Sequence, residues 1–324
     1  MSKRNETLTD TAERENVITR VFNAPRELVF QAWTDSKHLI NWWGPRGFSN
    51  TFKEITIKPG GVWLFTMHGP QGDFPNRIVF EEIVEPERLV FIIDSGVEND
   101  PLQFEMIVTF EEEGNKTKLT MRQVFSTKAI RDMLDNEFKA VEGAHQTLDK
   151  LEEELVTMSG DQFVISREFE APRDLVWKVY TEAEHLAKWW GPKGFKMLHN
   201  KMDLKPGGLF HYCMQTPDGH EMWGRFVYRD IIAPQRVVFT NSFSDAKGNA
   251  VRAPFNPNWP LEVLNTVTLT ERNGKTTMTL KGGPFNATDE ERKIFAGAHA
   301  MMDQGFKGTF DQLDEYLTKV KISK

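Results

Sequence analysis

The sequence repeats itself over the length of a whole domain. Residues 17–63 align without a gap on residues 164–210, at an offset of 147, and 22 of the 47 positions are identical. The four-residue word Trp-Trp-Gly-Pro occurs at 42–45 and again at 189–192. A repeat of about 150 residues is far longer than the unit of a solenoid, so it indicates a duplicated domain.

Later matches set the boundaries of the two copies. Residues 143–155 match residues 305–317 at an offset of 162, because the second copy is longer over residues 246–260. That longer stretch is rich in Gly, Asn and Pro and is typical of a loop. The sequence therefore predicts a polar N-terminal tail, a first copy and a second copy, at residues 1–16, 17–158 and 159–324.

Each copy begins with a strand and two short helices. Residues 17–23 are β-prone, and Pro25 suits the first turn of a helix. Asp35 or Ser36 can cap a second helix, which ends near Gly44. About six further strands follow, separated by turns such as Pro-Gly-Gly at 59–61.

A single long helix is predicted to close each copy. In the first copy, apolar residues recur at intervals of three and four from Ile130 to Leu155, and in the second copy from Phe295 to Val320. An antiparallel sheet with one apolar face needs a cover, and this helix is large enough. The fold class is therefore α+β, with about six or seven antiparallel strands in each copy curving around a long C-terminal helix. A twisted sheet wrapped around a helix leaves room for a cavity between them.

Composition excludes several function classes. The net charge is −7 and neither copy is strongly basic, which argues against nucleic-acid binding. The single cysteine, Cys213, forms no internal disulfide and fits a reducing compartment. No apolar run resembles a signal peptide or a membrane span, so we expect a cytoplasmic protein.

Taken together, these motifs resemble a known family. The Ala-Pro word after the first strand, the Trp-Trp-Gly-Pro word, the Pro-Gly-Gly turn and a final helix containing Gly143 are similar to the START-like (SRPBCC) superfamily. The resemblance is to the branch named for the activator of heat-shock protein 90 ATPase, and it covers nearly the whole chain twice. It implies a helix-grip fold with a hydrophobic cavity, in a group that includes lipid and polyketide binders, cyclases and co-chaperone modules. Residues 1–16 do not resemble the additional amino-terminal domain of the true chaperone activator, which makes a chaperone partner doubtful.

The predicted ligand-binding residues lie on strands facing the helix, or on the helix itself. Alternation puts Trp63, Phe65 and Met67 on one face, where they either fill the core or line a pocket. A glycine inside a helix costs about 1 kcal/mol relative to alanine, so its presence reflects close packing, a kink or a wider cavity mouth. The full predicted set is Trp63, Phe65, Met67, Phe104, Met106, Gly143, Phe210, Tyr212, Met214, Trp223 and Gly305.

Each tryptophan pair is expected to place one ring in the core and the other near the surface, or else to form a ligand platform. His145 lies on the predicted apolar stripe and is interpreted as a partnered structural residue. His68, Arg77, Asp94 and Glu105 could orient a ligand, but their spacing matches no catalytic signature. We predict no catalytic residues, no metal site and no cofactor.

Three functions remain open. The first is non-catalytic binding of a small hydrophobic or amphipathic molecule in the cavity. The second is a cyclase- or dehydratase-like enzyme acting on a hydrophobic substrate there, which requires ionisable groups that converge inside the pocket. The third is an interaction module for a chaperone, which requires a large exposed apolar patch.

Overall fold

The computed structural model describes residues 11–69 and 71–322, and it divides the chain into two compact units, 1–158 and 159–324. Most of the predicted tail lies outside the described residues. Its last part is ordered, because a 3-10 turn (Ala12–Arg14) leads into a strand that begins at Glu15. Each unit is described by itself.

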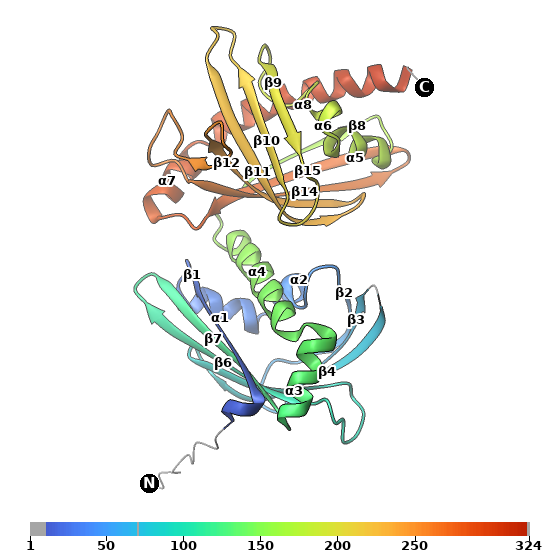
Figure 1. Cartoon of the computed structure of the whole chain (residues 1–324), viewed down its shortest axis with the longest axis vertical. Coiled ribbons are helices and arrows are strands. Elements are labelled where there is room, and N and C mark those ends of the chain that lie inside the picture. The colour runs from blue at the N-terminus through green and yellow to red at the C-terminus, as the bar shows by residue number, and fades with distance from the viewer. Residues whose placement is uncertain (1–10, 70, 323–324) are drawn as a thin grey trace. The chain divides into compact units, whose positions relative to one another are not determined.

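The first unit is one antiparallel sheet with four helices (Figure 1). The strands are adjacent in the order β1-β7-β6-β5-β4-β3-β2, so only the first strand is out of sequence. The elements are β1 (Glu15–Phe22), α1 (Arg26–Thr34), α2 (Ser36–Trp42), β2 (Ser49–Ile55), β3 (Val62–Gly69), β4 (Gly72–Val84), β5 (Arg88–Asp94), β6 (Phe104–Glu113), β7 (Lys116–Phe125), α3 (Lys128–Phe138) and α4 (Ala140–Met158).

The second unit repeats this order and adds one short strand. Its sheet runs β8-β15-β14-β12-β11-β10-β9, with β13 paired to β12 inside the stretch predicted as a longer loop. The elements are β8 (Phe163–Phe169), α5 (Arg173–Thr181), α6 (Ala183–Leu186), β9 (Lys196–Met202), β10 (Leu209–Gln215), β11 (Glu221–Ile232), β12 (Arg236–Ser244), β13 (Ala250–Val251), β14 (Glu262–Arg272), β15 (Lys275–Phe285), α7 (Asp289–Gly297) and α8 (His299–Ile322). The predicted tandem α+β helix-grip fold is confirmed.

Local chemistry explains the start of α2 and the turn that precedes the third strand of each unit. Asp35 caps α2, since its carboxylate accepts a hydrogen bond from the Lys37 amide at 2.9 Å. Gly61 closes the turn before β3, where an added Cβ would lie 2.1 Å from the Thr56 carbonyl oxygen. Gly208 is equally confined in the second unit, because an added Cβ there would lie 2.0 Å from the Asp203 carbonyl oxygen. Only glycine fits such a close approach of two backbone segments.

The prediction of one unbroken C-terminal helix is wrong in both units. In the first unit the helix breaks at Lys139, which adopts the left-handed conformation with φ 55°. The Asp135 carboxylate accepts a hydrogen bond from the Val141 amide at 3.1 Å and so satisfies a backbone donor in the first turn of α4. In the second unit the break falls at Ala298. Apolar periodicity continues through both breaks, so the pattern alone does not reveal them.

The inward-facing residues of α4 also differ from the apolar stripe that the sequence predicts. Ala144, Leu148 and Leu151 are buried, whereas His145 is exposed and does not lie on the inward face of the helix. The main contacts of α4 outside its own hairpin are with α1, α2 and β1. In Figure 1 the strands of the first unit curve around this helix.

Candidate functional site

A cavity of about 340 Å³ lies in the first unit, between the sheet, α4 and the loop that follows α2. Its volume is at the lower end of the range for small-molecule pockets. The described residues that line it are mainly apolar, with many aromatic rings and three methionines: Trp33, Trp43, Gly44, Pro45, Phe48, Phe65, Met67, Gln71, Phe74, Asn76, Ile93, Phe104, Met106, Met121, Gln123, Phe138, Lys139, Ala140, Gly143, Ala144 and Thr147.

Strand pairing explains why the sheet contributes these particular residues. Met106 lies opposite Gln123, and Phe65 lies opposite Asn76, so each pair projects from the same face. Alternation then adds Met121 and Phe104 to that face. The lining residues of β7 were missed by the sequence analysis, although the same two-residue period marks them once the pairing of β6 with β7 is known.

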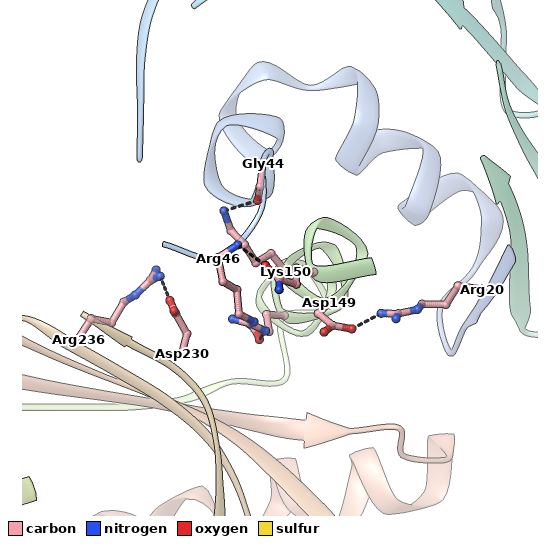
Figure 2. Close-up of polar contacts among 9 residues, drawn as sticks. Arg20, Gly44, Arg46, Asp149, Lys150, Asp230 and Arg236 are labelled. Atoms are coloured by element: carbon pink, nitrogen blue, oxygen red, sulfur yellow. Dashed lines mark hydrogen bonds and ion pairs between the residues drawn. The ribbon is translucent and has the colours of Figure 1, made fainter. Parts of the chain in front are cut away.

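Hydrogen bonds from α4 hold the loop after α2 in place (Figure 2). The Lys150 ammonium donates to the Gly44 carbonyl oxygen at 3.0 Å, and the Arg46 amide donates to Gln146 Oε1 at 3.1 Å. The Asn50 side chain donates to the Trp43 carbonyl oxygen at 2.8 Å from the other side. The part of the cavity wall formed by Trp43, Gly44 and Pro45 is therefore fixed by polar contacts.

Arg20 of β1 pairs with Asp149 on the same helix, so α4 is tied to the sheet edge as well (Figure 2). By contrast, α3 has no buried residue. Phe138, the last residue of α3, lines the cavity while 53% of its surface stays exposed. The cavity therefore has a rigid side at α4 and a loosely packed side at α3.

The chemistry of the lining is apolar with few polar groups. Gln71, Asn76 and Gln123 contribute amides. Thr147 contributes a hydroxyl that donates to the Gly143 carbonyl oxygen at 2.8 Å, and Lys139 contributes an ammonium. Among the described lining residues there is no carboxylate and no imidazole. Such a surface can bind and orient a molecule, and it offers no pair of groups for acid–base chemistry.

The polar residues considered from the sequence lie elsewhere. Arg77 and Asp94 form a two-point ion pair, with Nε–Oδ1 at 2.9 Å and Nη2–Oδ2 at 2.8 Å, and this contact raises the pKa of Arg77. His68 contacts Thr51 and Asp73 at 2.8 and 2.7 Å. Neither these residues nor Glu105 is part of the cavity lining.

Five of the six predicted residues of the first unit lie on the cavity: Phe65, Met67, Phe104, Met106 and Gly143. Trp63 does not, because its ring stacks on Phe65 at 4.5 Å and lies 5.2 Å from the Trp43 ring, within the core. Trp42 and Trp43 are both buried, with Trp43 on the cavity, so neither ring lies near the surface.

Three of the five predicted residues of the second unit lie in its buried core. Phe210, Tyr212 and Met214 are buried in its core. Trp223 lies on the opposite face of the sheet, stacked on His211 at 4.9 Å, and therefore does not line the interior. Gly305 lies within α8, and no atom is within 4 Å of the position where a Cβ would be.

Tyrosines distinguish the interior of the second unit from that of the first. Burial raises the pKa of Tyr212 to about 12, an effect that the neighbouring Trp190 side chain partly opposes. Burial also raises the pKa of Tyr180 and of Tyr228. By the alignment of the two copies, the corresponding residues of the first unit are Trp33, Phe65 and Phe80.

The longer loop of the second unit, at residues 246–260, contacts α7 and residues within it. Arg252 pairs with Glu291, the Asn258 side chain donates to Glu290 at 2.8 Å, and the Trp259 ring lies 5.4 Å from Phe295. A capping box formed by Thr288 and Glu291 begins α7. In consequence α7 buries Phe295 completely, whereas α3 of the first unit buries nothing.

Within residues 11–69 and 71–322 no cluster of His, Cys, Asp or Glu could hold a metal ion. None of the described helices is long and apolar enough to cross a membrane. A cytoplasmic location stays a prediction.

Comparison with models of protein families identifies the family of this chain. The model for the Activator of Hsp90 ATPase homolog 1-like protein matches residues 23–156 and again residues 170–318. The chain belongs to this family. The two matched regions correspond to the two units, so the resemblance deduced from the sequence is confirmed for both copies. A search of the curated proteins returned no match.

Several solved structures match parts or most of the chain. A protein from Arthrobacter aurescens is 27% identical with a TM-score of 0.42, and covers 50% of this chain and 88% of its own. A protein from Mycobacterium smegmatis is also 27% identical, with a TM-score of 0.41 and coverages of 48% and 90%. The di-domain ARO/CYC BexL from the BE-7585A biosynthetic pathway is 12% identical with a TM-score of 0.43, and covers 94% of this chain and 98% of its own.

Proposed function

We propose that the first unit binds one small apolar molecule that contains aromatic rings, and that it does so without catalysis. The observation that carries this proposal is the cavity of about 340 Å³, walled by aromatic rings and by Met67, Met106 and Met121. Thioethers pack favourably against aromatic rings and adapt to irregular shapes, which suits a ring-containing ligand. The volume corresponds to roughly eleven water molecules at about 30 Å³ each.

The polar groups of the lining favour binding over acid–base catalysis. Amides and a hydroxyl can orient a ligand, but a cyclase or dehydratase needs groups that exchange protons with it. The only ionisable side chain among the described lining residues is Lys139, which is exposed. We do not propose a chaperone partner, because no observation on the described residues favours one.

The second unit supplies a substitution that tests the proposal. Ala144 lines the cavity, and its counterpart in α8 is Phe306, whose ring stacks on Phe163 at 5.6 Å. Ala144→Phe should therefore fill the cavity of the first unit. The matched control is His145→Phe, which adds a ring at the next, exposed position of the same helix.

The measurement is titration with the dye N-phenyl-1-naphthylamine, whose fluorescence rises in apolar surroundings. We expect one bound dye per chain in the unaltered protein and in His145→Phe, and none in Ala144→Phe. Equal dye binding by both variants would overturn the proposal, provided that their thermal unfolding shows that both are folded.

A further inference from the structure

The cavity of the first unit opens to solvent where α3 meets α4. Phe138 and Lys139 both line the cavity, yet both side chains are exposed. These two residues therefore mark the mouth of the cavity, and a molecule bound inside it lies next to them. Lys139 brings to this mouth the only ionisable side chain among the described lining residues.

The ammonium of Lys139 is not paired with a group of the protein. No ion pair or hydrogen bond joins this side chain to another described residue. The two carboxylates nearest to it in sequence are engaged elsewhere: Asp135 accepts from the Val141 amide and Glu142 accepts from the Gln146 side chain, each at 3.1 Å. An ammonium at the edge of an apolar cavity attracts an anion, because apolar walls reduce the screening by water.

The backbone at this position is unfavourable for a lysine. Lys139 adopts the left-handed conformation with φ 55°, at the point where α3 ends. Glycine or asparagine is the usual residue at such a helix end, since other side chains crowd the backbone there. Positions of this kind concentrate at functional sites. The flexible stem of the side chain also allows the ammonium to extend over the mouth of the cavity.

A second, independent donor lies inside the cavity. Gln123 lines it with only 7% of its surface exposed. Its Oε1 accepts a hydrogen bond from the Asn16 side chain at 3.4 Å, while its Nε2 has no partner among the described residues. A buried donor without an acceptor is costly, so this amide favours a ligand that carries an oxygen atom.

The second unit lacks both donors. At the corresponding positions it has Met301 in place of the lysine and Gly282 in place of the glutamine. It also has Phe306 where the first unit has Ala144, and this ring packs against its core. The small residue that leaves room on α4 and the two unpaired donors therefore occur in the same unit, which supports a shared role in binding.

We propose that the ligand of the first unit is an aromatic carboxylate, whose rings lie in the cavity and whose carboxylate pairs with the Lys139 ammonium at the mouth. This inference rests on the proposed function and adds one anionic group to its ligand. The sign of the charge follows from the lining, which holds one ammonium and, among the described residues, no carboxylate. A single ammonium matches the single charge of a carboxylate better than the double charge of a phosphate monoester.

The test compares two probes of nearly equal shape, 2-naphthoate and 2-naphthamide, by titration calorimetry on the full chain. They differ in charge, so their ratio of affinities isolates the contribution of the ammonium. An ion pair that is open to solvent is weak, and we expect 2-naphthoate to bind about two- to fivefold more tightly. The preference should shrink as the ionic strength rises. The cation 2-naphthylmethylammonium should bind more weakly than either probe.

Variants of the lysine separate its charge from its place in the backbone. Lys139→Asn should abolish the preference for 2-naphthoate, and asparagine tolerates the left-handed conformation. Lys139→Arg retains the charge and should keep the preference. The matched control is Lys128→Asn, which removes an exposed lysine of the same helix that does not line the cavity, and it should leave the ratio unchanged.

Four results would overturn the inference: equal affinity for 2-naphthoate and 2-naphthamide in the unaltered protein, a preference that survives Lys139→Asn, a preference that Lys128→Asn reduces as much, or one that only Gln123→Met removes. These outcomes leave the proposed function intact if 2-naphthamide still binds and Ala144→Phe still blocks it. Failure of both probes and of the dye to bind would overturn the proposed function as well.

Discussion

Raising the pH above 10 should destabilise the second unit specifically, because its interior holds neutral tyrosines. All four tyrosines of the chain, Tyr180, Tyr212, Tyr228 and Tyr316, lie in that unit. Burial raises the pKa of Tyr212 from its ordinary value of 10.0 to about 12. Between these values the unfolded chain releases the phenolic proton and the folded unit keeps it.

The sign and the size of the effect follow from that difference. A folded-state pKa above the unfolded one gives stability that is present below pH 10 and is lost as the pH rises toward 12. At about 1.4 kcal/mol for each pKa unit, Tyr212 accounts for roughly 3 kcal/mol. Tyr180 and Tyr228 add to this loss in the same direction, since burial raises the pKa of each.

The assay is urea unfolding of the full chain at several pH values, followed by the near-ultraviolet absorbance of tyrosinate. Since every tyrosine is in the second unit, this signal reports on that unit alone. Tyr212→Phe is the control and introduces the residue found at position 65. It should reduce the fall in unfolding free energy by about 1.4 kcal/mol per pH unit, the effect of one proton. An identical pH dependence in both proteins would refute the reasoning.

Two further predictions concern the C-terminal helices. Gly143→Ala and Gly305→Ala should each stabilise the protein by about 1 kcal/mol in thermal unfolding, because a Cβ would meet Pro45 at an ordinary 3.7 Å in the first case and nothing within 4 Å in the second. Only Gly143→Ala should weaken dye binding, and equal effects of the two variants on the dye would contradict the placement of Gly143 on the cavity. Lys139→Gly should raise the unfolding free energy by about 1 kcal/mol by relieving the left-handed backbone at φ 55°, and a loss of stability would show that the conformation is not strained.

Much of the site followed from alternation along strands. The two-residue period correctly placed Phe65 and Met67, and Phe104 and Met106, on one face of the sheet, and all four line the cavity. The prediction failed for Trp223, because the sequence does not show that Gly224, and not Trp223, lies opposite the inward-facing Tyr212. Gln123 was missed because only strand pairing reveals its position beside Met106.

The sequence by itself determined the duplication, the order of elements, a cap at Asp35 or Ser36 and the turn at Gly61. These features depend on neighbours within a few residues, or on identity between the two copies, and both can be read along the chain. The tertiary structure alone decided where the long helix breaks and that the first unit has an open cavity. A cavity is the volume left between side chains that are far apart in sequence, so small differences between copies, such as Ala144 against Phe306, change it.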